Sequence, residues 1–252
     1  MLNLAFVKKE LQEFVKTPKL FIVLCLFAFF SILSPLTARY MNELLATLAS
    51  DVQISFPDPT FRDAWIQLYK NTTSLCLIVY LIMMTGTVAQ EKSKGSILLV
   101  LTKKVSRFQF LLGKFVAGAL LWTAGWVATL LIGGLYTQIL FHEVIYEGLF
   151  LSVVLMWLMG LFYTALAILA SVVSKTPTIA ALLGFSGYAI LNLLNVSETM
   201  ATYNPSGAAS LVNGILYGTI SSSIGLICLF STLAGTILVF SSSYLIFKRQ
   251  EI

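Results

Sequence analysis

The sequence has little charge: 11% of its 252 residues are Asp, Glu, Lys or Arg, whereas 58% are hydrophobic. Soluble domains carry about 25% charged residues, and a chain so poor in charge cannot cover a water-facing surface. The composition therefore excludes soluble, disordered and fibrous proteins and favours an integral membrane protein. A mean hydropathy of +0.90 agrees with this interpretation.

The sequence also lacks the residues that metal, disulfide and phosphate chemistry need. It has one histidine and three cysteines, and each cysteine falls inside an apolar run. Neither a zinc site nor a disulfide framework can be built from that set. The only Gly-Lys pair, Gly113-Lys114, has no glycine five residues before it, so the Walker A pattern is absent. No zinc-protease motif or nucleophile elbow is present either. We therefore expect this chain to have no metal, cofactor or catalytic residue of its own.

Long charge-free runs are what the sequence has in abundance, and a spanning helix takes about 20 residues. They predict an all-α integral membrane protein with one six-helix domain over residues 18–247. The expected spans lie at about residues 20–38, 71–90, 108–141, 148–174, 176–197 and 223–247. Turn residues around Asn204-Pro205 interrupt the last apolar stretch, so 198–222 is expected as a structured external or re-entrant segment.

The distribution of basic residues predicts the orientation. With six spans, 13 of the 16 lysines and arginines fall on the side of the N-terminus. We expect the protein to lie in the plasma (inner) membrane. The positive-inside rule then places both termini, including the tail 248–252, in the cytoplasm. Residues 39–70 and 198–222 lie outside; Phe61, Trp65, Leu68 and Tyr69 favour an interfacial helix there, with a simple loop as the alternative. The net charge of +5 then reflects this bias and attraction to membrane lipid, so no nucleic-acid partner is expected.

Residues 1–17 have the pattern of an amphipathic helix. Apolar residues recur at three- and four-residue spacing at Leu4, Val7, Leu11 and Phe14. The opposite face is predicted to carry Lys9, Glu10 and Glu13, with Phe6 as an apolar exception. Such a helix lies in the membrane interface with its apolar face in lipid and its polar face toward the cytosol. It is either a plain anchor or a docking surface for a cytoplasmic subunit.

The segment 91–107, after the second expected span, is the second cytoplasmic feature. It is rich in cations, and its apolar run Ile97–Leu101 predicts a short helix at the membrane surface. Charge that only retains the loop in the cytoplasm is the alternative interpretation, but it would need no particular order of residues. The order found here, with Glu91, Gly95 and Arg107 around an apolar run, is more specific than retention requires.

The order of residues in this segment resembles that in the permease subunits of ABC type-2 exporters. Their usual E-x-x-x-G-T phrase is matched by Glu91, Gly95 and Ser96, where serine replaces the common threonine. Their later phrase, with S-R and then G-K, is matched by 105–107 and 113–114, although Lys104 stands where proline is frequent. The N-terminal Lys9-Glu10-Leu11 resembles the amphipathic opening of the family, and Tyr203-Asn204-Pro205 resembles its proline-containing segment between the fifth and sixth spans.

The resemblance implies a partner-driven machine. Two permease copies or paralogues would pair in the membrane, and two ATPase subunits, which bind ATP and Mg²⁺, would grip them from the cytoplasm. Residues 91–107 would contain the coupling helix. The residues expected to take part in ATPase coupling are Glu91, Lys92, Lys94, Gly95, Ser96, Arg107 and Lys114, with Lys9, Glu10 and Glu13 on the interface helix.

The resemblance places the dimer contact and the substrate path around the second and fifth spans. The candidates there are Met83, Met84, Thr87, Asn192 and Asn195. The two asparagines are three residues apart on one helical face and could instead hydrogen-bond between helices. A largely apolar path suits an amphipathic, lipid-like or peptide cargo. The expected function is thus the permease of an ATP-driven exporter; the alternatives are a non-transporting sensor, immunity protein or mechanical scaffold on the same dock, and a self-contained carrier or channel.

Overall fold

The computed structural model describes residues 4–43, 57–97 and 105–250, apart from the side chain of Glu198. It confirms the expected fold class: over these residues the chain is helical without strands, and six helices are long and apolar enough to cross a membrane.

Thirteen helical segments lie wholly within the described residues. They are α1 (Leu4–Lys16), α2 (Lys19–Arg39), α4 (Phe61–Asn71), a π-helical segment (Thr72–Cys76), α5 (Leu77–Ser93), α7 (Arg107–Phe141), α8 (Leu149–Val173), α9 (Pro177–Leu193), a 3-10 turn (Leu194–Val196), α10 (Glu198–Tyr203), a 3-10 turn (Pro205–Gly207), α11 (Ala208–Leu216) and α12 (Ser222–Arg249).

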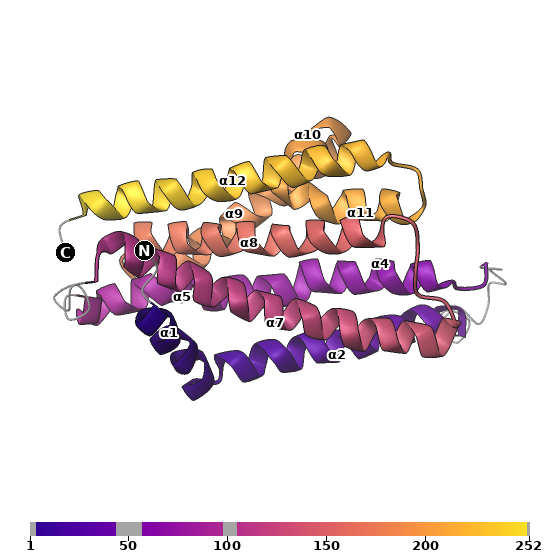
Figure 1. Ribbon diagram of the computed structural model, residues 1–252, viewed down its shortest axis with the longest axis horizontal. Coiled ribbons are helices and arrows are strands. Elements are labelled where there is room, and N and C mark those ends of the chain that lie inside the picture. The colour runs from indigo at the N-terminus through magenta and orange to yellow at the C-terminus, as the bar shows by residue number, and fades with distance from the viewer. Residues whose placement is uncertain (1–3, 44–56, 98–104, 251–252) are drawn as a thin grey trace, which may run out of the picture.

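The long helices lie side by side in an elongated bundle (Figure 1). The helix α8 packs against α12, α5, α9 and α7, while α2 packs along α7. In the most apolar stretch of α8, 67% of the residues are buried, whereas in that of α9 only 11% are. Helix α8 is therefore central and α9 peripheral. The short α1 lies obliquely across α7, at the end of the bundle where α12 ends (Figure 1).

Aromatic rings fill the middle of the bundle. The indole of Trp122 on α7 is fully buried and contacts the rings of Phe27 on α2 and Tyr80 on α5. It reaches α8 at Gly160, where an added Cβ would collide with the indole. Only glycine lets the two helices approach this closely, so this residue sets their spacing.

The second span begins earlier than the sequence predicted. The helix α4, the π-helical segment and α5 form one continuous helix, Phe61–Ser93, which starts ten residues before the expected span 71–90. Trp65, Leu68 and Tyr69 are buried in the core on a helix, so the simple loop expected around them is wrong. The helix that was the other expectation does form here, and it continues directly into α5. Reliance on charge-free runs placed the start of the span too late, because Lys70 interrupts the run inside the helix.

Hydroxyl groups accompany the π-helical segment. Thr72 Oγ1 donates to Leu68 O at 2.8 Å and Ser74 Oγ donates to Lys70 O at 2.7 Å. A π turn disturbs the regular backbone ladder, and such side chains can bond the carbonyls it leaves exposed.

Two further segments were expected to contain local structure. Residues 198–222, expected as a structured segment, form α10, a 3-10 turn and α11 before α12 begins. Most of the run Ile97–Leu101, expected as a surface helix, lies outside the described residues; Ser96 and Ile97 have helical conformation.

Candidate functional site: a buried ion cluster at one end of the bundle

Three helices that are distant in sequence meet at the end of the bundle that holds α1. Helix α7 starts there with a capping box, in which Ser106 and Gln109 satisfy each other's backbone N–H groups. One turn further on, Gly113 leaves room for the Phe6 ring of α1, with which an added Cβ would collide. The glycine of the Gly-Lys phrase therefore lets α1 dock closely on α7.

The lysine that follows this glycine is buried at the centre of an ion cluster. Lys114 Nζ lies 2.9 Å from Glu10 Oε2 of α1 and 2.9 Å from Glu91 Oε1 of α5. Its side chain is 1% exposed, and those of Glu10 and Glu91 are 2% and 13% exposed. One ammonium thus joins α1, α5 and α7 through two carboxylates.

A second ammonium closes the cluster from the solvent side. Lys9 Nζ, on a half-exposed side chain, lies 3.0 Å from Glu10 Oε1 and 3.2 Å from Glu91 Oε1. Glu13 joins at longer range, 3.9 Å from Lys9 and 3.8 Å from Lys19. Three carboxylates and three ammonium groups make the cluster formally neutral.

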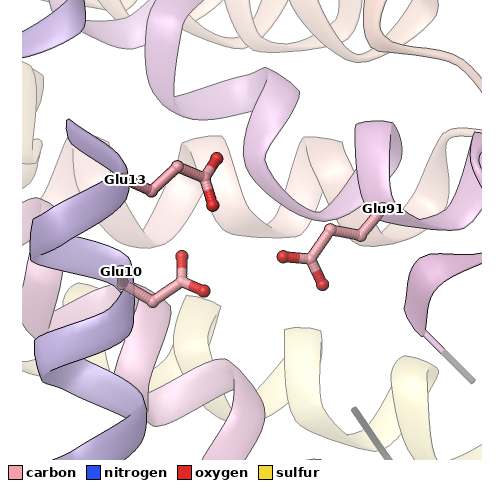
Figure 2. Close-up of side chains that lie close together, drawn as sticks. All are labelled: Glu10, Glu13 and Glu91. Atoms are coloured by element: carbon pink, nitrogen blue, oxygen red, sulfur yellow. The ribbon is translucent and has the colours of Figure 1, made fainter. Parts of the chain in front are cut away.

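Figure 2 shows how the carboxylates of Glu10, Glu13 and Glu91 converge from α1 and α5. One oxygen from each lies within 4.8 Å of the others, a spacing that a divalent cation could use. However, Lys114 and Lys9 already bind the oxygens of Glu10 and Glu91, so a metal ion would have to displace an ammonium group. The arrangement fits an ion-pair cluster better than a metal centre.

The charges of the cluster control its protonation. Burial opposes ionisation of the Glu10 carboxyl, but the charge and hydrogen bond of Lys114, with those of Lys9, outweigh it and lower the pKa of Glu10. Burial likewise opposes the charge of Lys9, and Glu10 and Glu91 outweigh it and raise the pKa of that ammonium. Both groups are therefore held in their charged forms.

One oxygen of the cluster is left without a partner. Glu91 Oε2 is buried and accepts no hydrogen bond from any described residue. A buried unpaired carboxylate oxygen costs free energy, so this arrangement does not satisfy Glu91 fully.

The buried face of α1 differs from the predicted one. Phe6, Val7, Glu10 and Phe14 are buried, whereas Leu4 is 73% exposed. The prediction that Glu10 faces the cytosol is wrong, because Lys114 provides a buried counter-charge for it. The same packing accounts for Phe6, which lay outside the predicted apolar face.

Two further cations bind the ends of neighbouring helices. Arg107 Nη1 lies 2.7 to 2.9 Å from the carbonyl oxygens of Phe247, Lys248 and Gln250, where α12 ends. Lys92 Nζ donates to Val172 O at 2.6 Å, near the end of α8, and to Gln250 Oε1 at 3.0 Å. Cations at helix C-termini neutralise the unpaired carbonyls and the helix dipole.

The remaining residues of the expected coupling set lie at the surface. Lys94 and Gly95 are exposed, and Ser96 is half-buried, with a weak 3.4 Å bond to Glu91 O. Gly95 has φ of +68° and open space around its Cα, so it serves a turn rather than a close backbone approach. It follows α5 where glycine commonly ends a helix.

The candidates for a substrate path are not gathered at one surface. Met84 and Thr87 are buried in the protomer, and Met83 is half-buried. Asn192 is exposed and donates to Tyr188 O at 2.9 Å. Asn195 donates to Ser206 Oγ at 3.0 Å and accepts from Asn204 Nδ2 at 2.7 Å, which is the inter-segment bonding that the sequence left open.

Sequence reasoning did not find Gln250 and Ser206, which take part in these two networks. Gln250 Nε2 also donates to Val172 O at 3.0 Å, so the last turn of α12 is tied to α8. A polar residue after Lys248-Arg249 gave no periodic signal. For Ser206, the turn-forming Asn204-Pro205 pair was the available signal.

Comparison with known proteins gives a family match over nearly the whole chain. The model of a family described as ABC-2 family transporter protein matches residues 4–252. The uncharacterized transmembrane protein YxlG of Bacillus subtilis (strain 168) is 23% identical over 186 residues, which cover 72% of this chain and 71% of that protein.

Proposed function

Because this chain belongs to the ABC-2 family of transporter membrane proteins, we propose that it is the permease subunit of an ATP-driven exporter. Its family consists of permease-type membrane domains without nucleotide-binding sites, which work with ATPase subunits. The ion cluster supports the absence of a nucleotide site. Lys114, the lysine of the only Gly-Lys pair in the sequence, lies on α7 and is buried against the carboxylates of Glu10 and Glu91, so it does not face a phosphate site.

The cluster around Lys114 is the observation that carries the proposal. It joins α1, α5 and α7 at the point where α5 ends and the exposed segment begins with Lys94 and Gly95. An ATPase that grips this segment would move the three helices together, because separating them would leave buried charges unpaired. ATP-driven motion would then reach the spans as a rigid-body displacement.

The composition of the spans supports a cargo class. The middle parts of the six spanning helices carry no Asp, Glu, Lys, Arg or His. Ion and proton carriers usually need such groups within the membrane. We therefore propose an amphipathic, lipid-like or peptide cargo, moved across the plasma membrane by two permease copies or paralogues with two ATPase subunits. Lys94, Gly95 and Ser96 would face the ATPase, with the termini in the cytoplasm.

The structure selects the variants that test this proposal. Glu91 and Lys114 are unsuitable, because their replacement would disturb the fold. Lys94→Glu changes an exposed cation and is the cleaner variant, whereas Gly95→Ala also changes an exposed position but strains a turn in which φ is +68°. We expect the tagged chain to co-purify with a nucleotide-binding subunit in mild detergent. Both variants should lower permease-stimulated ATP hydrolysis by about fivefold or more. That factor corresponds to a coupling free energy of about 1 kcal/mol.

Lys175→Glu provides a matched control, because Lys175 is an exposed cation in the connection between α8 and α9. It should leave ATP hydrolysis unchanged. The proposal fails if no nucleotide-binding subunit co-purifies, or if Lys94→Glu and Gly95→Ala leave stimulation unchanged. ATP-dependent uptake into inverted vesicles then separates an exporter from a sensor or scaffold that uses the same ATPase without moving a cargo.

A further inference from the structure

The far end of the bundle, away from the ion cluster, contains a large pocket. It has a volume of about 770 Å³ and lies between α10, α11 and the first turns of α12. Small-molecule sites occupy roughly 300–1,000 Å³. The lining residues are Asn195, Thr199, Ala201, Thr202, Tyr203, Ser210, Leu211, Thr219, Ile220, Ile224 and Ile227. The pocket is therefore large enough to hold an organic head group and the start of an attached chain.

One part of this lining offers hydroxyl groups. Thr199, Tyr203 and Ser210 are exposed, and their hydroxyls have no hydrogen-bond partner among the described residues. In contact with lipid tails such groups would lose hydrogen bonds that water or a polar ligand supplies. They can donate to and accept from a ligand that carries hydroxyls of its own.

Another part of the lining is apolar and continues onto the outer surface of the bundle. Ile224 and Ile227 lie on the first turns of α12, and Ile220 lies just before the helix begins. Ile227 is 41% exposed, and Phe230, one turn further on, is 65% exposed. A hydrocarbon chain held by the isoleucines could leave the pocket along α12 directly into the membrane.

The pocket lacks charge. No residue from Thr199 to Phe247 is Asp, Glu, Lys, Arg or His, and the lining includes no basic side chain. A phosphate head group would have no cation to pair with here, although phosphate recognition normally uses arginine or lysine. The chemistry selects a neutral lipid over an anionic phospholipid.

We propose that this pocket binds an uncharged lipid whose head group carries free hydroxyls, such as a diacylglycerol or a glycosyl diacylglycerol. The head group is held by the hydroxyls of Thr199, Tyr203 and Ser210, and one acyl chain follows Ile224 and Ile227 along α12. This binding site does not depend on the proposed coupling to an ATPase.

Photolabelling of the full chain in nanodiscs tests the proposal. Three probes carry the same diazirine-bearing acyl chain: diacylglycerol, glucosyl diacylglycerol and phosphatidylglycerol. We expect one or both neutral probes to label the peptide that contains Ile220–Ile227 more strongly than phosphatidylglycerol. The peptide around Leu131, which is 62% exposed on α7, reports contact with bulk lipid and should be labelled equally by all three.

Two variants distinguish a site from general lipid contact. Thr199→Val with Ser210→Ala removes two hydroxyls at nearly constant volume, and Ile224→Trp fills the apolar part of the pocket. A hydrogen bond is worth about 1 kcal/mol, so the double variant should weaken labelling by neutral lipid about tenfold or more. Ser242→Ala, whose hydroxyl lies at the other end of α12 and donates to Leu238 O, serves as the control.

The double variant keeps the test valid even if Ile224→Trp does not fold. Equal labelling of Ile220–Ile227 by all three probes would overturn the proposal, because it would indicate ordinary contact with the bilayer. Labelling by neutral lipid that persists in the folded double variant would overturn it as well. Preference for only one neutral probe would support the site and identify which head group it takes.

Discussion

The two ends of this bundle are held together by different chemistry. At the end that carries α1, a buried ammonium on Lys114 joins Glu10 and Glu91, and Arg107 binds the end of α12. At the other end the shorter hydrogen bonds between segments join neutral groups, although Arg62 and Asp63 also contact Tyr217 near the surface. There Asn204 Nδ2 donates to Leu191 O at 2.6 Å, and the indole of Trp65 donates to Val144 O at 2.9 Å.

This difference determines how the stability of each end responds to a substitution. A neutral hydrogen bond contributes about 1 kcal/mol net, so the loss of one contact is tolerated. In a buried ion cluster each charge depends on its partners, and removal of one leaves the others desolvated and unpaired. The charged end is therefore held in one arrangement until the whole cluster changes, whereas the neutral end weakens in small steps.

Removal of the central cation should have the largest effect. Lys114→Leu leaves Glu10 and Glu91 without the ammonium that both bind, and we expect a loss of about 3–5 kcal/mol in the free energy of unfolding. Tryptophan fluorescence during thermal unfolding in detergent measures it. Lys94→Leu is the matched control, because this exposed lysine should contribute within about 0.5 kcal/mol. Similar losses in the two variants would show that burial of the charge is unimportant.

A truncation at the neutral end should have a smaller effect. Asn204→Ala removes the donor to Leu191 O and to Asn195 Oδ1 and leaves those oxygens to find new partners. We expect a loss of about 1–3 kcal/mol in the free energy of unfolding. The same thermal unfolding assay applies, with Asn192→Ala as control because Asn192 is exposed. A loss that equals or exceeds that of Lys114→Leu would contradict the comparison between the ends.

The sequence was sufficient to predict the class of fold. Runs without charge identified all six apolar helices, because burial in lipid leaves a strong composition signal. The phrase from Glu91 to Lys114 identified the family, which the match over residues 4–252 confirms. Both signals are local in sequence and need no knowledge of which helices touch.

The partners of the charged residues could not be predicted in the same way. Glu10 was placed on the cytosolic face because it is charged, yet Lys114 provides a buried counter-charge 104 positions along the chain. The hydrophobic pattern of a helix shows which residues are polar, but it does not show which residues they pair with. A buried charged residue therefore gives the same pattern as a solvent-exposed one. Phe6 was an exception in the predicted pattern for the same reason, since its contact at Gly113 lies on another helix.

Acidification should distinguish the charged end of the bundle from the neutral end. The pKa of Glu10 is lowered from 4.5 because its interactions with Lys114 and Lys9 outweigh the effect of burial. A carboxyl with a lowered pKa stabilises the fold above its unfolded-state pKa, and this contribution is lost as the pH falls through the folded-state pKa. We therefore expect the contribution of Glu10 to stay constant from pH 7 to about 5 and to decline below about 4.5.

Melting temperatures of the wild type, Glu10→Gln and Asn204→Ala between pH 7 and 3 test this prediction. Glu10→Gln should melt lower at pH 7 and lose less than the wild type on acidification, because it has no carboxyl at this position to protonate. Asn204→Ala should also melt lower at pH 7, but its decline should run parallel to that of the wild type, because no titrating group is lost. If Glu10→Gln also declines in parallel with the wild type, the acid sensitivity arises from other carboxyls, and the charged end does not respond to pH through Glu10.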